Sequence, residues 1–578
     1  MVKIKELETL RDIITNRCDV YKDRIAFLEK DKITRKFNEI TYSKLQSDTI
    51  ALGTAMIKYL KLEDKKIAVI GENSYKWYVT YMATVCGIGI VVPLDKELPV
   101  NEVENLMQRS CAECIVYSSR EKEKIESLKP KLNKDVIFIE MDKEKSDDIS
   151  YAYDEILKKG YEYLDKKDST YLDKELDPNK FVALIFTSGT TAKPKGVMLC
   201  HRNFVSNIKS CEKRMPASID ARYFSILPIH HTYEFMINYL NPISKGSSVV
   251  ICEGLKFFMK DMQATHPDVI VVVPLIVEKV IRTMEKEIIK QGKQKQIEHV
   301  AKVANAFSKI GIDFRRKIFK EVINNFGGKL KYIFCGGAPL SLEMIKKVKS
   351  FGFVFVQGYG LTEAAPLVAT ASPKEQAPGT VGKPIPGCEV RIDLEENQSE
   401  GEIIVKGPNV MLGYYKNEEE TQKVLKKGWL YTGDIGHFDN KGNLIISGRS
   451  KNVIVTQNGK KIFPEELEFL IDQTALVNES LVYGKPSKEQ KNELILTARV
   501  TLDKEYIQDT YGAQRPSDEQ LYNMIWQDIK NINHTLVSYK SIKLLEIKKE
   551  DFVKTTTLKI KRAEELKTPA DITKESFK

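Results

Sequence analysis

The densest group of phosphate-binding side chains in the sequence is TSGTTAKPKG at 187–196. This segment combines four hydroxyl side chains with two lysines, and it directly follows the apolar run FVALIF at 181–186. Backbone N–H groups, hydroxyls and ammonium groups are the donors that phosphate oxygens accept. A polar turn is the alternative, but the position after a strand favours a phosphate-binding loop. It is not a Walker A loop, because no Gly-Lys pair here precedes Ser or Thr.

A second group of chemically active side chains is PIHHTYEF at 228–235. A metal site made of His230, His231 and Glu234 is one interpretation, and it is the weaker one because no further ligand stands at a zinc-like spacing. The sequence has no GxSxG nucleophile elbow, which disfavours a serine hydrolase. Cys111 and Cys114 form a close pair without a matching second pair, so we expect two core thiols.

Buried strands must position these segments. Short, nearly continuous apolar runs alternate with amphipathic helical stretches, as expected for a large α/β region with a mostly parallel sheet. Ligands of such sheets bind beyond the carboxyl ends of the strands. The runs are FVALIF (181–186), YFSILP (223–228), SVVIC (248–252), VIVVV (269–273), KYIFC (331–335) and FVFVQ (353–357). The apolar stretch 79–94 contains Gly and Pro and predicts a buried helix running into a strand.

The pattern changes after about residue 371. Short strand-like pieces with Gly, Pro and Asn predict an antiparallel β appendage, and beyond it helices and strands of an α+β unit follow. The predicted helices are PEELEFLIDQT and DEQLYNMIWQDIKNI, and the predicted strands are ELILTARVTL and IKLLEI. We therefore predict a domain at 1–449 and a small one at 450–578.

The composition is that of a soluble globular protein. Of 578 residues, 42% are hydrophobic and 29% are charged, which excludes collagen-like and wholly disordered chains. The net charge of +10 is too small to argue for nucleic acid as a partner. Nine scattered cysteines favour a reducing compartment, and the N-terminus lacks the apolar run of a signal peptide, so we expect a cytoplasmic location.

The segment from Glu285 to Lys331 is helical in pattern and rich in Lys and Arg. A solvated helical face is the simpler interpretation. A peripheral contact with an anionic membrane is the alternative.

Four ordered motifs give the chain a resemblance to the adenylate-forming superfamily, which includes acyl-CoA synthetases, peptide-synthetase adenylation domains and beetle luciferases. The resemblance covers nearly the whole chain. It implies a large N-terminal domain of mostly parallel α/β sheets with an antiparallel β appendage, and a small mobile α+β C-terminal domain. The motifs are TSGTTAKPKG (187–196), GYGLTEAAP (358–366), YTGDIGHFDNKGNLIISGRSKN (431–452) and TTTLKIKR (555–562).

The resemblance implies a nucleotide site that activates a carboxylate with ATP. Glu363 and Thr190 would help to place Mg²⁺, and Asp434 with Arg449 would bind the ribose hydroxyls. The remaining residues are assigned as follows: Thr187, Ser188, Gly189, Thr190, Thr191 and Lys195 to the β- and γ-phosphates, Gly337, Ala338, Gly358 and Tyr359 to adenine, and Thr362 to the α-phosphate.

The C-terminal motifs imply a two-step reaction. Lys559 matches the family's mobile catalytic lysine, whose ammonium can bridge the carboxylate and the α-phosphate. Lys451 matches the hinge about which the C-terminal domain rotates between adenylation and thioester formation. After rotation, Gly459 and Lys460 would border the pantetheine tunnel of CoA.

Several features indicate the long-chain branch of the superfamily. His231 matches a histidine that borders the carboxylate, and Phe235 falls where some long-chain enzymes place an aromatic gate to the acyl tunnel. Leu558 before the catalytic lysine, the long insert before GGAPL and the run FPEELE at 463–468 agree with this branch. The resemblance thus implies AMP-forming ligation of a medium- to long-chain fatty acid to CoA.

Other functions remain open. A fatty acyl-AMP ligase that delivers the acyl group to an acyl carrier protein is the close alternative. A catalytically inactive nucleotide-binding scaffold is a remote one, because the candidate chemical residues are all present. Fold alone does not exclude a luciferase-type oxygenase.

Overall fold

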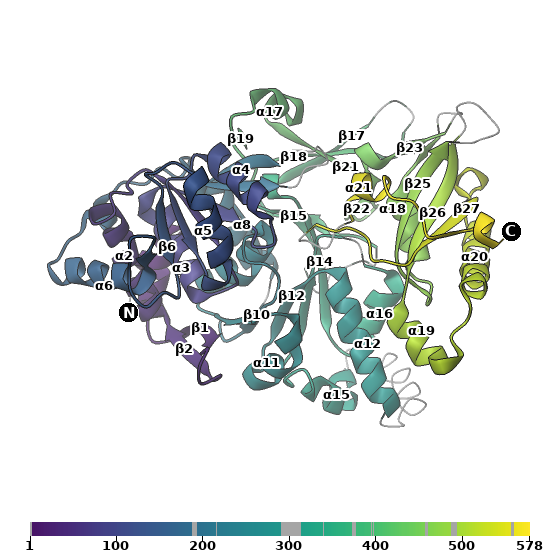
Figure 1. Cartoon of the computed structure of the whole chain (residues 1–578), viewed down its shortest axis with the longest axis horizontal. Helices are drawn as coiled ribbons and strands as arrows, with labels where there is room; N and C mark the ends of the chain where they lie inside the picture. Colours follow the sequence, from purple (N-terminus) through teal and green to yellow (C-terminus); the bar gives the residue numbers. More distant parts are fainter. Residues whose placement is uncertain are drawn as a thin grey trace. The chain divides into compact units, whose positions relative to one another are not determined.

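A computed structural model describes the whole chain except residues 1–2, 188–193, 216, 291–313, 339, 373–376, 378, 395, 397, 457–459, 487–493, 556–559 and 578. The chain forms two compact units (Figure 1). One comprises residues 1–390 and 405–430, and the other comprises residues 391–404 and 431–578. The division into domains 1–449 and 450–578, with a hinge at Lys451, stays a prediction.

A nine-stranded sheet in the larger unit contains most of the predicted apolar strands. Its order is β16-β15-β14-β13-β12-β10-β11-β1-β2, and the strands from β14 to β1 are parallel. Every residue of β12 is buried, as its continuous apolar sequence predicts. The strands are β1 Ile25–Lys30, β2 Phe37–Thr41, β10 Arg222–Ser225, β11 Ser248–Ile251, β12 Val269–Val272, β13 Tyr332–Cys335, β14 Val354–Gly360, β15 Leu367–Thr370 and β16 Lys383–Pro384.

An eight-stranded sheet in the same unit has the order β19-β9-β8-β4-β3-β5-β6-β7. It is parallel from β8 to β7, whereas β9 and β19 Gly413–Tyr414 run antiparallel at its edge. The remaining strands are β3 Lys66–Ile70, β4 Ile90–Leu94, β5 Cys114–Tyr117, β6 Ile137–Glu140, β7 Tyr151–Ala152, β8 Phe181–Thr187 and β9 Lys195–Cys200. The predicted helix-to-strand run at 79–94 is confirmed by α3 Tyr75–Ala83, the π-helix Thr84–Ile88 and β4.

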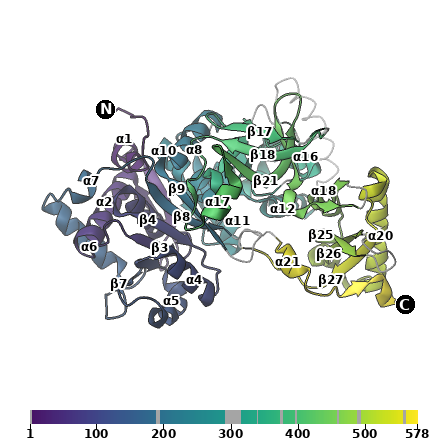
Figure 2. The same cartoon turned by 90° about the horizontal axis from the view of Figure 1, so that it is seen from above.

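Helices cover both sides of this sheet (Figure 2). On one side, α4 Val100–Ser110 and α5 Lys122–Leu128 bury their apolar residues against β3, β4 and β5. On the other side lie α2 Tyr42–Lys58 and α6 Tyr153–Asp165. The buried residues of α6, Tyr153, Ile156 and Gly160, recur every three or four positions, which is the spacing of one helix face.

The smaller unit confirms the α+β pattern predicted for the C-terminal region. Its four-stranded sheet has the order β25-β26-β27-β28, with a core made largely of Leu, Ile and Val side chains. Ser517 and Gln520 form a capping box at the start of α20, which fixes the beginning of that helix. The elements are α18 Pro464–Ile471, β25 Val477–Pro486, β26 Leu494–Leu502, α19 Lys504–Tyr511, α20 Asp518–Thr535, β27 Leu544–Lys548, α21 Arg562–Glu565 and β28 Ile572–Thr573.

Five further strands form the predicted β appendage. Its path β17-β18-β21-β20 carries β22 beside β21, and the β20–β21 and β21–β22 pairs are antiparallel. The strands are β17 Glu389–Asp393, β18 Gly401–Lys406, β20 Leu425–Lys426, β21 Trp429–Phe438 and β22 Leu444–Arg449.

The expectation of two core thiols is wrong for one of them. Cys114 is buried at the start of β5, but Cys111 is exposed. Cys111 follows α4 in the left-handed conformation, with φ of 54°, and this conformation places it in the turn that ends the helix at the surface.

Part of the basic segment 285–331 is used for packing. Arg315 Nη1 donates to the Lys349 carbonyl oxygen at 2.8 Å, and Arg316 Nη1 donates to that of Leu330 at 2.6 Å. Residues 291–313 lie outside the described residues, so the contact with anionic lipid stays a prediction. Among the helices that are described, none is long and apolar enough to cross a bilayer.

The contact between α2 and α6 generates a prediction about stability. A Cβ atom on Gly160 would lie 2.0 Å from the carbonyl oxygen of Ala51, a backbone atom that cannot move aside cheaply. Gly160→Ala should therefore lower the thermal unfolding midpoint, with a cost of about 1–3 kcal/mol, although Ala favours helices. Lys158→Ala, at an exposed position of the same helix, is the matched control and should change stability by less than about 0.5 kcal/mol. An unchanged midpoint for Gly160→Ala would contradict this packing.

Candidate active site

The predicted phosphate loop connects two antiparallel strands of the eight-stranded sheet. Thr187 at the end of β8 pairs with Lys195 at the start of β9, and the Thr187 hydroxyl donates to the Lys195 carbonyl oxygen at 3.4 Å. Four predicted phosphate-binding residues, Ser188, Gly189, Thr190 and Thr191, lie outside the described residues. The described strands thus fix where the loop begins and ends.

Arg109 supports the end of this loop. Its Nη2 donates to the carbonyl oxygen of Pro194 at 2.8 Å, and its guanidinium carbon lies 5.5 Å from the centroid of the Phe186 ring. Arg109 belongs to the last turn of α4, far from the loop in sequence. No motif in the sequence pointed to it.

Lys195 and Glu363 meet at Tyr414. The Lys195 ammonium lies 4.9 Å from the centroid of the Tyr414 ring, and the Tyr414 hydroxyl donates to Glu363 Oε1 at 2.9 Å. The β19–β9 pairing positions the tyrosine by placing Tyr414 opposite Val197. Burial, and then the Glu363 carboxylate, raise the pKa of Tyr414, so the phenol remains a hydrogen-bond donor.

Glu420 balances the charge of Lys195. It lies in α17 Glu418–Val424, whose first turn is capped by the Asn417 side chain, and its carboxylate pairs with the Lys195 ammonium. The hydrogen bonds from Lys195 and Lys423 lower the pKa of Glu420 to about 2, so this carboxylate is ionised at neutral pH. Glu420 is 225 positions from Lys195, and sequence reasoning missed it along with Tyr414.

Further predicted site residues lie at the carboxyl ends of β13 and β14. Because these strands are parallel, their ends share one edge of the nine-stranded sheet. Gly337 follows β13 with φ of 87°, a conformation that glycine adopts without strain, and both Gly337 and Ala338 are exposed. Gly358 and Tyr359 lie just before Gly360, the last residue of β14, and the short helix Thr362–Ala364 follows.

Two hydrogen bonds to backbone carbonyl oxygens hold the short helix Thr362–Ala364, which contains Glu363. The Glu363 carbonyl oxygen accepts from the Met411 N–H at 2.8 Å, three residues before Tyr414. Asn207 Nδ2 donates to the Ala364 carbonyl oxygen at 3.2 Å. The turn is therefore tied to the segment that carries Tyr414 and to the helix that follows β9.

His231 lies beyond the carboxyl end of β10. This strand belongs to the same nine-stranded sheet and is separated from β13 by β12. A hydrogen-bond network shapes this exit loop: Asn73 Nδ2 donates to Ser225 Oγ at 3.0 Å and to the Leu227 carbonyl oxygen at 2.7 Å. Asn73 Oδ1 accepts from the Ile229 N–H at 2.9 Å. The network fixes the backbone two residues before His231.

Glu234 is poorly suited to be the carboxylate ligand of a metal site in the histidine segment. Glu234 is fully buried and accepts from Ser225 Oγ at 2.6 Å and from Asn238 Nδ2 at 3.0 Å. Burial raises the pKa of Glu234 to about 8, so it is mostly protonated at neutral pH. Within the described part of the chain, no group of three His, Cys, Asp or Glu residues could hold a metal ion.

Phe235 begins a π-helix, Phe235–Leu240, and lies inside an aromatic cluster. It is 2% exposed, and its ring centroid lies 4.0 Å from that of Tyr81 and 5.9 Å from that of Trp77. Tyr78 and Tyr239 complete the cluster. The side chain thus packs in an apolar wall at the end of the histidine segment.

The remaining predicted site residues belong to the smaller unit. Asp434 and Arg449 are paired across β21 and β22, with Arg449 Nε 3.0 Å from Asp434 Oδ1. Lys451 lies in the short helix Ser450–Asn452 and is exposed. Lys460 lies between the antiparallel strands β23 Ile454–Val455 and β24 Lys461–Ile462. Its carbonyl oxygen accepts from the Thr456 N–H at 3.0 Å, and its N–H donates to the Thr456 hydroxyl at 3.1 Å. Gly459 and Lys559 lie outside the described residues.

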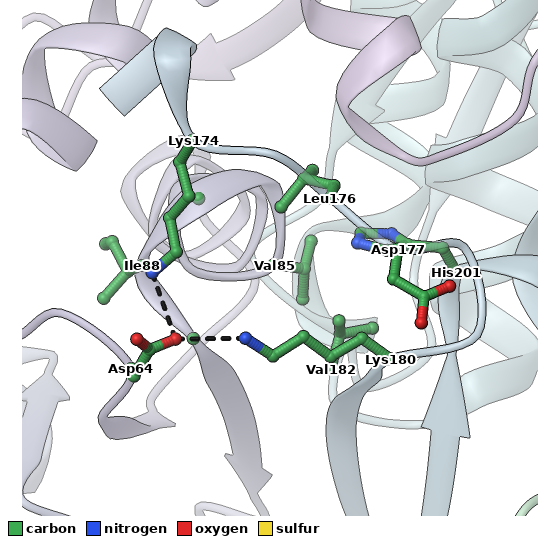
Figure 3. A pocket seen from close by; sticks show the side chains of 11 residues that line it. Asp64, Val85, Ile88, Lys174, Leu176, Asp177, Lys180, Val182 and His201 are labelled. Carbon is green, nitrogen blue, oxygen red and sulfur yellow. Dashed lines mark hydrogen bonds and ion pairs between the residues drawn. The ribbon is translucent and has the colours of Figure 1, made fainter. Parts of the chain in front are cut away.

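A small cavity lies at the opposite end of β8 and β9 from the phosphate loop (Figure 3). At its rim, Asp64 Oδ1 accepts from Lys174 at 3.0 Å and from Lys180 at 3.1 Å. His201, directly after β9, also lines it. With a volume of about 20 Å³ it has room for one water molecule, so it is not a nucleotide site.

Comparison with known proteins gives two family matches in the same chain. Residues 14–415 match the family described as AMP-binding enzyme, and residues 451–575 match the one described as AMP-binding enzyme C-terminal domain.

Curated relatives align with most of the chain. The long-chain-fatty-acid–CoA ligase 1 of Cavia porcellus is 27% identical over 83% of this chain and 72% of its own length. The chloroplastic long-chain-fatty-acid–[acyl-carrier-protein] ligase AEE15 of Arabidopsis thaliana is 26% identical over 92% of this chain and 81% of its own. The long-chain-fatty-acid–CoA ligase FadD15 of Mycobacterium bovis is 30% identical over 66% of each.

Solved structures share the fold. The anthranilate CoA ligase AuaEII, in complex with anthranoyl-AMP, superposes with a TM-score of 0.77 at 19% identity, covering 96% of both chains. The o-succinylbenzoate coenzyme A synthetase MenE of Bacillus subtilis, in complex with AMP, gives 0.72 at 21% identity, covering 97% of this chain and 98% of its own. The predicted α/β fold with a smaller C-terminal unit is therefore confirmed. Since one family description spans more than half of the sequence and contains both described ends of the phosphate loop, the chain belongs to the AMP-binding enzymes.

Proposed function

We propose that this enzyme uses ATP to activate a medium- to long-chain fatty acid as an acyl adenylate and then transfers the acyl group to CoA. The observation that carries the proposal is the junction at Tyr414, where a phosphate-loop lysine and a carboxylate suited to Mg²⁺ come together. The names of the relatives supply the class of acid, and two of those described above are long-chain-fatty-acid–CoA ligases.

The reaction proceeds in two displacements. A carboxylate oxygen attacks the α-phosphorus of ATP, the bond to the β-phosphate bridging oxygen breaks, and pyrophosphate leaves with both electrons. The CoA thiol then loses its proton to solvent or a base and attacks the acyl carbon, and AMP leaves with the oxygen that came from the carboxylate. Both steps need negative charge on phosphate to be neutralised, which cationic donors and Mg²⁺ supply.

Glu363 is suited to hold Mg²⁺ together with Thr190 and the phosphates of ATP. The ion binds oxygen ligands and usually takes only one or two carboxylates from the protein. A carboxylate can accept about four hydrogen bonds or ligands, so Glu363 can accept the bond from Tyr414 and bind the ion as well. When bound, Mg²⁺ would offset charge on the phosphates. Tyr414 would hold the Glu363 carboxylate in orientation.

Residues from several of the sequence motifs would hold the nucleotide. Thr187, the loop residues 188–191 and Lys195 would bind the β- and γ-phosphates, and Lys195 would exchange Glu420 for phosphate oxygens. Asp434 and Arg449 would bind the ribose hydroxyls. The other assignments stand as proposed from the resemblance: Gly337, Ala338, Gly358 and Tyr359 at adenine, Thr362 at the α-phosphate, Lys559 at the carboxylate and α-phosphate, Lys451 as the hinge, and Gly459 and Lys460 at the CoA tunnel.

The acyl chain would bind along the apolar wall after β10. His231 would border the carboxylate, and the cluster around Phe235 would contact the first methylenes. The buried strand β12 and the amphipathic helix α12 Pro274–Lys290 would extend this wall. Transfer to a carrier protein is the second candidate, because the Arabidopsis relative is named as an acyl-carrier-protein ligase.

The first prediction from the proposed function concerns the substrates. With ATP and CoA, kcat/KM should rise from short to long fatty acids, because each buried methylene contributes about 0.8 kcal/mol. The measurement is AMP and thioester formation across acids from acetate to long-chain fatty acids, with CoA or an acyl carrier protein as acceptor. Acetate or benzoate used as efficiently as long fatty acids would contradict the assigned acid, and thioester formation on the carrier alone would replace CoA as acceptor.

The second prediction tests the Tyr414 junction. Tyr414→Phe keeps the ring beside Lys195 but removes the donor to Glu363, and a hydrogen bond to a charged group contributes about 1.5–3 kcal/mol. ATP–pyrophosphate exchange should fall by about tenfold or more. Tyr415→Phe, at the neighbouring position, is the matched control and should stay within about twofold of the wild type. Equal rates for both variants would show that the hydroxyl plays no part in adenylation.

The third prediction separates the two half-reactions. Lys559→Ala should lose acyl-AMP formation but still convert supplied acyl-AMP and CoA to acyl-CoA, because its ammonium acts only on the first displacement. Lys451→Pro, which restricts the backbone at the hinge, should mainly impair the second step. Each half-reaction is assayed separately for both variants. Acyl-AMP formation at the wild-type rate by Lys559→Ala would refute the assignment of the catalytic lysine.

A further inference from the structure

A buried hydrogen-bond network joins the end of β10 to the π-helix Phe235–Leu240. At its centre is Glu234, which is fully buried and whose carboxyl group accepts from Ser225 Oγ at 2.6 Å and from Asn238 Nδ2 at 3.0 Å. Asn238 Nδ2 also donates to the Phe224 carbonyl oxygen at 3.1 Å. The side chain of Glu234 therefore connects the last residue of β10 with the π-helix that follows it.

The hydroxyl of Ser225 extends this network to the other sheet and to the apolar wall. It accepts from Asn73 Nδ2 at 3.0 Å, and Asn73 follows β3 of the eight-stranded sheet. It also lies 2.7 Å from the Tyr239 hydroxyl, and the Tyr239 ring stacks on that of Phe235 with 6.2 Å between the centroids. A buried polar group that loses its partner costs free energy, so this set of bonds favours one arrangement of the segment.

Glu234 lies between the two residues that we assign to the carboxylate end of the acyl site. The Phe235 N–H donates to the His231 carbonyl oxygen at 2.9 Å and closes the turn that contains Glu234. A shift of the Glu234 side chain would therefore move both neighbours. π-helices of this kind occur frequently at functional sites.

We infer that Glu234, as a neutral carboxylic acid, is a positioning residue that fixes His231 and Phe235 for the carboxylate end of the fatty acid. Its partners in the described part of the chain are neutral dipoles, and no lysine or arginine there pairs with it. Burying an unpaired charge costs far more than burying a neutral carboxyl group. This inference rests on the proposed function, in which these two residues border the acyl substrate.

The titration of Glu234 supplies a signature. Burial raises the pKa of Glu234 to about 8, and the bonds from Ser225, Asn238 and the Ile226 N–H lower it only in part. The neutral form is therefore lost as the pH rises through about 8. Wild-type acyl-AMP formation should decline over the same range, and the KM for the fatty acid should rise.

The neighbouring titratable groups leave this signature to a carboxyl group. Burial raises the pKa of Tyr233, beside Glu234, and of Tyr239, so both phenols stay neutral in this range. The thiol of Cys252, after β11, also interacts with Tyr239, and burial raises its pKa to about 12. Glu29 of β1 is the remaining group that interacts with Tyr239, and burial raises its pKa as well.

Two variants of Glu234 test the inference by ATP–pyrophosphate exchange. Glu234→Gln keeps the size and an oxygen for Ser225 and is neutral at every pH, so exchange at pH 7 should stay within about threefold and the decline near pH 8 should disappear. Glu234→Leu removes the hydrogen bonds. It should raise the KM for the fatty acid by about tenfold or more, because small misplacements at a site are costly, while the KM for ATP stays within about twofold.

Glu29→Gln is the matched control. The Glu29 carboxylate accepts from the Tyr75 N–H at 2.9 Å, at the start of α3 and not in the loop after β10. This variant should leave the KM for the fatty acid within about twofold and should retain the decline near pH 8.

Four results would overturn the inference. A wild-type KM for the fatty acid in Glu234→Leu would show that the residue positions nothing in the acyl site, and an equal rise in both KM values would show that it only stabilises the larger unit. A decline near pH 8 that persists in Glu234→Gln would exclude the neutral acid as its cause. If the wild-type enzyme forms no acyl-AMP from any fatty acid, the proposed function fails first, and the inference falls with it.

Discussion

The ammonium of Lys195 is the charge around which the described part of the site is arranged. It is held between the Glu420 carboxylate and the face of the Tyr414 ring, with 13% of its side chain exposed. A partly buried cation needs such partners, because water solvates it poorly there. The same tyrosine donates to Glu363. A single side chain thus sets the distance between a cation and a carboxylate that would act on the same phosphates.

The two sheets of the larger unit make this contact possible. Lys195 starts β9, the strand next to the edge strand β19 of the eight-stranded sheet, whereas Glu363 follows the last parallel strand of the nine-stranded sheet. The short strand β19 extends the first sheet and brings Tyr414 to the turn after the second. Asn73 makes a comparable connection, since it follows β3 and bonds to the loop after β10. The candidate site therefore lies between the two sheets of the larger unit. Hydrogen bonds of Tyr414 and Asn73 hold the loops of the two sheets together there.

Elements whose side chains all lie in the same environment, such as strands buried on both faces, could be predicted from the sequence. β12 and β13 could be predicted because strands buried on both faces need continuous apolar runs. The phosphate loop could be recognised because its donors are neighbours in sequence. Tyr414, Glu420 and Arg109 could not be found, because each reaches the loop from a distant segment through tertiary packing. Cys111 was expected in the core because the Cys111–Cys114 pair lacks a second pair for a metal site, but the turn that ends α4 exposes it.

The central claim is that the carboxylate itself attacks the α-phosphorus of ATP. The most direct test uses a long-chain fatty acid labelled with ¹⁸O in its carboxylate, incubated with the enzyme, ATP, Mg²⁺ and CoA, followed by mass spectrometry of the phosphorus products. The account predicts one ¹⁸O atom in each AMP and none in pyrophosphate. Label in inorganic phosphate, with ADP as the nucleotide product, would mean that the acid attacks the γ-phosphorus and would contradict the account.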